Sequence, residues 1–358
     1  MKYIDASDYK LEIGSLEKSS FSSVLASYKE SAIVIVVDEN THQHCLPYLI
    51  TTFSELSKAE VIVLPKGEEN KQFSIVFNVW EALTEYQISR SDLIINLGGG
   101  MITDMGGFIA SCYKRGCDFI NIPTSLLGMV DASIGGKTGV NLDNYKNQIG
   151  VFANPKIVYI DTSFLQSLPT EELKNGYAEI IKHGLITSQE LYLTALTKSE
   201  SLSEIDEAFL LQFIEVKNDI VKKDPKEKGL RKILNFGHTI GHVIEGHFMD
   251  SLQISHGHSV AIGMVMEAFL STKHSTLNKK SYSSIEKALF SQFSIPKLND
   301  KDIQSMISML SNDKKNSKGR INVCLLKSIG NCTYDNYLNE KSFMEMFLHF
   351  KNLQINLN

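Results

Sequence analysis

Short, continuous apolar runs recur through the first half of this sequence, and they constrain the fold more than any other feature. The runs are AIVIVVD (residues 32–38), EVIVLP (60–65), DLIINL (92–97), DFINIP (118–123) and IVYID (157–161). Their apolar residues do not alternate with polar ones, which is typical of strands covered on both faces of a parallel sheet. Between the second and third runs, Val76, Val79, Trp80 and Leu83 of FSIVFNVWEALTEY (73–86) fall on one helical face. This alternation of strand and helix predicts an α/β domain with a parallel sheet.

The second half of the chain is dominated by helical periodicity. TEELKNGYAEIIKHGLI (170–186) and AFLLQFIEVKNDIVKKD (208–224) have long helical patterns, whereas INVCLL (321–326) resembles a strand. Because 358 residues exceed the usual size of one core, we predict two domains, residues 1–160 and a helical domain of residues 161–358. The charged run KKDPKEKGLRK (222–232) is interpreted as a solvated helix end and loop.

Composition argues against several classes of protein. The formal net charge of −5 disfavours a general nucleic-acid interface. The chain has five cysteines, an odd number, and no two of them are spaced as a CxxC pair. This usage is typical of reduced thiols in the cytoplasm. The N-terminus does not resemble a signal peptide, and no apolar run is long enough to span a bilayer. We therefore expect a cytoplasmic protein that binds neither nucleic acid nor membrane.

Three consecutive glycines, Gly98 to Gly100, directly follow the third apolar run. Glycines there let the backbone approach a phosphate at a helix N-terminus, and a tight strand-to-helix turn is the alternative interpretation. PKGEENK (65–71) follows another strand end, and such loops share the ligand-binding edge of a parallel sheet. Two candidate loops at one edge favour a dinucleotide-binding site over a simple turn. Asp104 would then either cap the helix or contact a ribose hydroxyl.

Residues 122–150 read as a long loop rich in Gly, Ser, Thr and Asn, and long ordered loops are usually functional. Lys137 within GGKTG suits an oxyanion, but its spacing differs from the GxxxxGK[ST] P-loop, which argues against an NTPase. Several further cations predict a substrate with more than one negative charge. They are Arg115, Lys146, Lys182, Lys217 and Arg231.

Five histidines lie between His238 and His258. His238 and His242 are four residues apart and share one helical face, which suits a divalent metal, although packed or surface histidines are the alternative. Thr239 stands where a zincin metalloprotease needs glutamate. We expect a third ligand from His256 or His258 and a carboxylate from Glu179. Two histidines and a carboxylate form a catalytic zinc arrangement, and with a nicotinamide nucleotide they predict alcohol oxidation.

The chain from about residue 30 to residue 330 closely resembles the 3-dehydroquinate synthase family of sugar-phosphate cyclases, and long motifs between residues 98 and 264 carry the resemblance. They are GGGMITDMGGFIA, YKRGCDFINIPTSLLGMVDASIGGKTGVN, KNQIGVFANP, GYAEIIKHGLI, KGLRKILNFGHTIGHVIE and HGHSVAIGM. The resemblance implies a Rossmann-like parallel-sheet domain that binds NAD, an all-α C-terminal domain, and a site in the cleft between them.

The resemblance also implies roles for individual residues. Zinc or cobalt would be held by Glu179, His238 and His256. NAD would be contacted by Asp38, Glu68, Lys71, Gly99, Gly100, Asp104, Thr124, Ser125, Lys146 and Thr162. The small-molecule substrate would be handled by Arg115, Asp131, Lys137, Asn147, Lys182, Lys217, Arg231, Asn235 and His242, with Lys314 as a further phosphate ligand. Arg115 would reach the partner subunit's site, which implies a homodimer.

The implied enzyme is a carbon–oxygen lyase of the shikimate pathway. It would convert 3-deoxy-D-arabino-heptulosonate 7-phosphate to 3-dehydroquinate and phosphate by transient NAD oxidation, β-elimination of phosphate, re-reduction and intramolecular aldol closure. Lys137 and Asn147 would hold the phosphate, Lys217 and Arg231 the carboxylate, and His242 would assist proton transfer. Asp131 and Lys182 would orient hydroxyl groups.

One position departs from the family pattern, because His258 stands where the family usually has a glutamate after His-Gly. Loss of a carboxylate behind the metal ligands predicts weaker metal binding or a shifted pH profile. Three alternatives to a 3-dehydroquinate synthase stay open. They are another sugar-phosphate cyclase, a metal- and NAD(P)-dependent polyol or alcohol dehydrogenase of the same fold, and a non-catalytic paralogue.

Overall fold

The computed structural model of the protein describes residues 1–142, 145–249, 251–252, 254–311 and 320–355. Packing divides the chain into two compact units. The first comprises Met1–Gly176 and Ser203–Lys222, and the second comprises Tyr177–Leu202 and Lys223–Asn358. The division falls within helix α6 (Thr170–Thr187). The predicted domain boundary at residue 160 stays a prediction, because compact packing units and independently folding domains need not coincide.

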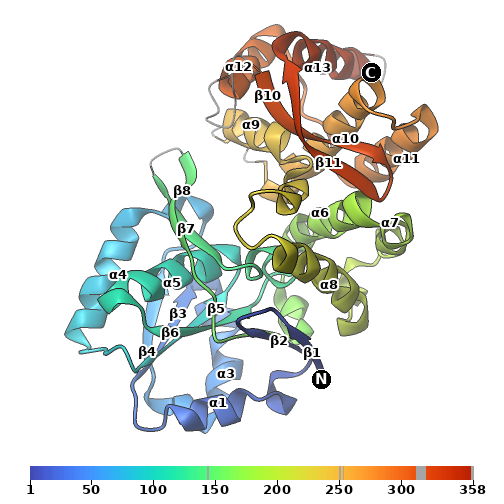
Figure 1. Ribbon diagram of the computed structural model, residues 1–358. Helices are drawn as coiled ribbons and strands as arrows, with labels where there is room; N and C mark the ends of the chain where they lie inside the picture. The colour runs from blue at the N-terminus through green and yellow to red at the C-terminus, as the bar shows by residue number, and fades with distance from the viewer. Residues whose placement is uncertain (143–144, 250, 253, 312–319, 356–358) are drawn as a thin grey trace. The chain divides into compact units, whose positions relative to one another are not determined.

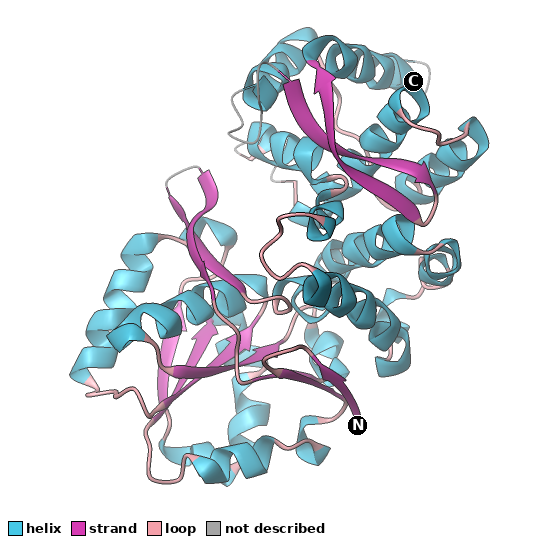
Figure 2. Cartoon of the chain, in the orientation of Figure 1, coloured by secondary structure: helices cyan, strands magenta, loops and turns pink. Residues whose placement is uncertain are grey.

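A seven-stranded sheet forms the centre of the first unit, in the order β1-β2-β9-β6-β5-β3-β4 (Figures 1 and 2). The five predicted strands are confirmed as β3 (Ile33–Asp38), β4 (Glu60–Leu64), β5 (Leu93–Gly98), β6 (Asp118–Pro123) and β9 (Ile157–Ile160). They pair in parallel, as predicted. Two strands near the N-terminus, β1 (Lys2–Asp5) and β2 (Lys10–Ile13), were not predicted; they pair antiparallel, and β2 joins β9 in parallel.

Helices cover both faces of this sheet, which explains the continuous apolar runs of its strands (Figure 1). On one face lie α4 (Phe73–Glu85) and α5 (Gly100–Cys112), and on the other α1 (Phe21–Ser27) and α3 (Leu46–Thr52). On the predicted face of α4, Val76, Val79 and Leu83 are buried in one core cluster with side chains of β3, β5 and α5, and Trp80 packs against this cluster partly buried. The unit also contains α2 (Glu39–His44) and α8 (Glu207–Lys223), whose last residue falls in the second unit.

The loop predicted over residues 122–150 is corrected by the structure, because part of it forms a hairpin. Strands β7 (Lys137–Leu142) and β8 (Tyr145–Phe152) pair antiparallel, with Gly139 opposite Gly150. A Cβ on Gly139 would lie 2.6 Å from the Ile149 carbonyl oxygen, so glycine permits the close approach of the two strands. Glycine is depleted in strands and enriched in turns, so these residues indicated a loop in the sequence.

The second unit is mainly helical, with α7 (Gln189–Leu196), α9 (His238–Phe248), α10 (His256–His274), α11 (Lys279–Phe290), α12 (Asp300–Ser311) and α13 (Glu340–Ile355). It is not all-α, because β10 (Arg320–Ser328) and β11 (Asn331–Asn339) form an antiparallel hairpin. The strand predicted at residues 321–326 lies within β10, whereas the polar sequence of β11 gave no signal. Across the helices in the described ranges, none has the length and apolar character needed to cross a bilayer.

Candidate metal centre and nucleotide-binding edge

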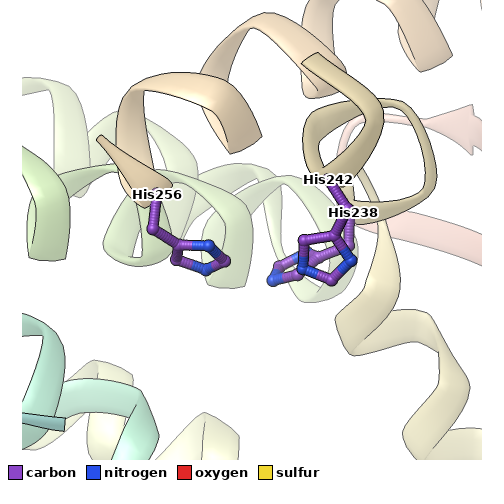
Figure 3. Close-up of side chains that lie close together, drawn as sticks. All are labelled: His238, His242 and His256. Atoms are coloured by element: carbon purple, nitrogen blue, oxygen red, sulfur yellow. The ribbon is translucent and has the colours of Figure 1, made fainter. Parts of the chain in front are cut away.

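Three histidines converge in the second unit (Figure 3). His238 and His242 project from the start of α9, and His256 is the first residue of α10. One ring nitrogen of each lies within 4.8 Å of those of the other two. Two nitrogens bound to one tetrahedral zinc lie roughly 3.3 Å apart, so small side-chain rotations would bring the three to a common ion.

Glu179 adjoins this histidine cluster from α6, and its side chain is fully buried. Its Oε1 lies 3.5 Å from Nε2 of His238, and its Oε2 contacts the ammonium of Lys182. Among the described residues, neither oxygen has a hydrogen bond of good geometry. The Lys182 ammonium is the charged partner of this buried carboxylate. The three imidazoles suit Zn²⁺ or Co²⁺, and Glu179 lies beside one of them, His238. The side chains present therefore fit a divalent ion.

The outer nitrogens of two of these rings face fixed acceptors. Nδ1 of His238 lies 3.4 Å from the Phe236 carbonyl oxygen, and Nδ1 of His256 lies 3.4 Å from Oε2 of Glu245. Donation from Nδ1 leaves Nε2 unprotonated and available to a metal. His258 is directed differently, since its Nε2 donates to the Ser294 carbonyl oxygen at 2.6 Å.

Most of the predicted NAD residues lie at the carboxyl ends of parallel strands in the first unit. Asp38 ends β3, Glu68 and Lys71 follow β4, Gly99 and Gly100 follow β5, Thr124 and Ser125 follow β6, and Thr162 follows β9. Strands that run parallel end at one edge of a sheet, which is where α/β proteins bind ligands. Lys146 lies instead in β8.

The turn between β5 and α5 leaves helix N–H groups available. Gly99 is the N-cap of α5, and no side chain of the described residues caps this helix. The Thr124 amide donates to the Gly98 carbonyl at 3.0 Å, and a Cβ on Gly99 would lie 3.1 Å from Oγ of Ser125. The tight turn considered as an alternative is therefore present, and it also leaves the helix N-terminus suited to an anion.

Lys71 contacts two residues that were predicted to bind NAD and one that was predicted to bind the substrate phosphate. Its buried ammonium donates to Oδ2 of Asp104 at 2.6 Å and to Oδ1 of Asn147 at 2.8 Å, and it lies 3.8 Å from Oε1 of Glu68. Burial alone would lower the pKa of Lys71, but the carboxylates of Asp104 and Glu68 raise it. Lys71 is therefore a fixed positive charge at this edge.

Asn141 is a residue of this network that the sequence analysis missed. Its Oδ1 accepts from the Asn147 amide at 2.9 Å, and its Nδ2 donates to Oε1 of Glu68 at 3.3 Å. Its own amide donates to the Lys71 carbonyl at 2.8 Å, which ties the hairpin to the loop after β4. Asn147 adopts a φ of 50°, and the contact with Asn141 holds this left-handed conformation.

The other predicted substrate residues of the first unit are dispersed. Lys217 of α8 pairs with Asp131 at 2.6 Å, and Lys137 begins β7. Arg115 lies in the turn after α5, at the opposite end of this helix from Gly99. A helix of 13 residues is about 20 Å long, so Arg115 is distant from the glycine turn of its own chain.

In the second unit, Arg231 and Asn235 are held by the charged run that the sequence analysis interpreted as a solvated loop. Arg231 is buried and donates from Nη1 to the Pro225 carbonyl at 2.6 Å, so this one residue departs from that interpretation. The rest of the run agrees with it, because α8 ends at Lys223 and the lysines of the run that precede Arg231 are exposed. Asp224 accepts from the amides of Lys228, Gly229 and Arg231, and these bonds hold its pKa below the usual value although burial would raise it.

Glu227, also missed in the sequence, accepts from Nδ2 of Asn235 at 2.6 Å. The only sequence signal for it was its place between the candidate cations Lys217 and Arg231. The predicted phosphate ligand Lys314 lies outside the described residues.

Comparisons with known proteins match both halves of the chain to the same family. The family described as 3-dehydroquinate synthase N-terminal matches residues 61–175, and that described as 3-dehydroquinate synthase C-terminal matches residues 176–316. A 3-dehydroquinate synthase from Parabacteroides distasonis is 39% identical over 347 residues, covering 95% of this chain and 97% of that protein.

Solved structures of two cyclases share the fold. A 2-deoxy-scyllo-inosose synthase complexed with carbaglucose-6-phosphate, NAD⁺ and Co²⁺ has a TM-score of 0.84 at 24% identity, covering 97% of this chain and 99% of that one. The 2-epi-5-epi-valiolone synthase from Streptomyces hygroscopicus, with NAD⁺ and Zn²⁺ bound, has a TM-score of 0.83 at 25% identity, covering 98% and 99%.

Proposed function

Because this chain belongs to the 3-dehydroquinate synthase family, we propose that it converts 3-deoxy-D-arabino-heptulosonate 7-phosphate to 3-dehydroquinate and phosphate. It would act as a carbon–oxygen lyase with NAD and a Zn²⁺ or Co²⁺ ion. The observation that carries the proposal is the gathering of His238, His242 and His256 beside buried Glu179. When bound, NAD supplies reversible hydride acceptance and the ion polarises the substrate oxygen.

The side chains of the first unit bind the charged parts of cofactor and substrate in this proposal. The N-terminus of α5 receives the pyrophosphate of NAD, and the Lys71–Asp104 pair orients the nucleotide at the sheet edge. Asn147 and Lys137 of the β7–β8 hairpin bind the phosphate group of the substrate and the phosphate that leaves in the elimination. The bond from Lys71 to Asn147 supports this assignment, because it couples the nucleotide edge to the phosphate residues.

The side chains of the second unit handle the oxidised carbon and the carboxylate. Glu179, His238 and His256 hold the ion, while the more exposed His242 moves a proton at the substrate hydroxyl. Arg231 binds the substrate carboxylate, and Asn235 is oriented by Glu227. Lys182 binds a hydroxyl, and burial beside Glu179 keeps it close to the metal ligands.

Turnover of the heptulosonate phosphate tests this function directly. The metal-free protein is reconstituted with Co²⁺ and a substoichiometric amount of NAD, and phosphate and 3-dehydroquinate are followed together. We expect equal amounts of both products, no net NADH, and loss of turnover on chelation. Net NADH formation from a polyol, or phosphate release without 3-dehydroquinate, would contradict the proposal.

Arg231 distinguishes a 3-dehydroquinate synthase from cyclases whose substrates lack the carboxylate. Arg231→Met should raise KM for the heptulosonate phosphate, since a charge-assisted contact is removed. Lys232→Met is the matched control, because Lys232 is a neighbouring cation that pairs with Asp335 at 2.8 Å instead. Equal effects of the two substitutions on KM would argue against carboxylate binding by Arg231.

Homodimer formation and a cytoplasmic location are part of the same proposal. Arg115 is separated from the glycine turn by the length of α5, which supports its action in the partner subunit's site. All five cysteines are free thiols, which is the state expected in a reducing compartment.

A further inference from the structure

Helices α9 and α10 are packed so closely that the histidines they carry are fixed relative to one another. A Cβ on Gly241 of α9 would lie 2.9 Å from the Ser259 carbonyl oxygen of α10. A Cβ on Gly263 of α10 would lie 2.0 Å from the Gly237 carbonyl oxygen. Backbone-to-backbone contact of this kind leaves no room for the helices to slide, so the remaining freedom of the site is the rotation of its rings.

Glu245 limits that rotation for His256. It lies on α9, its side chain is buried, and its Oε2 is 3.4 Å from Nδ1 of His256. A buried carboxylate needs a polar or charged partner, and a neutral imidazole that donates from Nδ1 presents an unprotonated Nε2. The contact therefore selects both the tautomer and the orientation of His256.

His258, two residues after His256, does not fill this role. His258 is the position at which the sequence analysis expected an effect on the metal, yet its Nε2 donates to the Ser294 carbonyl, and its ring packs against Phe293. The carboxylate that contacts His256 comes from the neighbouring helix instead.

We propose that Glu245 is a positioning residue of the metal centre, which accepts a hydrogen bond from Nδ1 of His256 and thereby directs Nε2 of this ring to the ion. This inference rests on the metal site of the proposed function. It also implies that the loss of the usual glutamate at position 258 leaves metal affinity largely intact, because Glu245 supplies the acceptor from α9.

The test is Co²⁺ binding to the metal-free, full-length protein, without substrate or NAD. Affinity is measured by chelator competition, and the visible d–d absorption of Co²⁺ reports the ligand geometry. Glu245→Gln removes the charge, and Glu245→Asp keeps the charge but withdraws the carboxylate from His256. Glu286→Gln is the matched control, because Glu286 is a half-buried carboxylate of the same unit that accepts from Tyr282 instead. Unfolding of each metal-free variant is measured in parallel.

We expect both Glu245 variants to bind Co²⁺ about 10- to 100-fold more weakly with an altered d–d spectrum, as is typical when a partner behind a metal ligand is lost. Glu286→Gln should match the wild type, and the metal-free variants should unfold at similar temperatures. Wild-type affinity and spectrum in Glu245→Gln would overturn the inference while leaving the proposed function intact. A wild-type protein that binds no Co²⁺ would overturn both.

Discussion

At the scale of single residues, the buried carboxyl group of Glu267, which contacts the start of α9, makes the stability of the protein depend on pH. It is fully buried on α10, and its Oε2 accepts from the Gly237 amide at 2.8 Å. Burial raises the pKa of Glu267 from 4.5 to about 8, against the lowering effect of backbone hydrogen bonds from Gly237, Ile240 and Thr239. Between these pH values the folded protein retains a proton that the unfolded chain releases, so its stability falls as pH rises.

We therefore predict that the free energy of unfolding of the wild type decreases between about pH 5 and pH 8, and that Glu267→Gln reduces this decrease. The amide has nearly the shape of the protonated carboxyl group, so the variant should be close to wild type at the acidic end. Urea unfolding at several pH values measures the difference. Parallel pH profiles for the two proteins would show that Glu267 does not titrate in this range.

Substitutions in the histidine cluster distinguish a metal ligand, His256, from a residue that transfers a proton, His242. His256→Ala should abolish tight Co²⁺ binding, whereas His242→Asn should retain it and lose about 10²- to 10⁴-fold in kcat, the usual contribution of a general acid or base. Binding is measured by chelator competition and turnover by phosphate release. If His242→Asn loses Co²⁺ as completely as His256→Ala, the ion is held by three histidines and the assigned role of His242 is wrong.

At the scale of elements, the contact between α9 and α10 depends on individual glycines. Gly241→Ala should lower the free energy of unfolding by about 1–3 kcal/mol, because the new Cβ meets backbone atoms of α10. Gly246→Ala on the same helix is the control, since its Cβ would meet only the mobile end of Met309 and alanine favours helix by about 1 kcal/mol. Equal destabilisation by both substitutions in urea unfolding would contradict tight packing at Gly241.

The elements also show where sequence reasoning succeeds. The parallel strands were predictable because burial on both faces leaves continuous apolar runs, as in β5. The β7–β8 hairpin was not, since Gly139 and Asn141 are residue types that are depleted in strands and typical of turns. In the candidate site, the histidine spacing on α9 was readable, but Glu245, Glu227 and Asn141 act through contacts between distant segments that no local pattern contains.

At the scale of the whole molecule, Arg115 provides a test of assembly. If it completes the partner subunit's site, Arg115→Ala and Lys137→Ala subunits should complement each other. In an equal mixture with random exchange, half of the dimers are mixed and each has one intact site, so activity should return to about a quarter of wild type. Mixed subunits are assayed for phosphate release. Activity no higher than that of the separate variants would place Arg115 outside the partner's site.

The position of β9 in the sheet has a consequence for synthesis on the ribosome. This strand lies between β2 and β6, and the register pairs Ile13 with Ile160. A nascent chain that has not yet emerged past Ile160 therefore exposes two open strand edges, one of them beside the N-terminal segment. Open edges invite pairing with other chains, and closure over so long a sequence separation is slow. Ribosomal pausing before residue 157 should thus promote aggregation of this protein more than pausing after it.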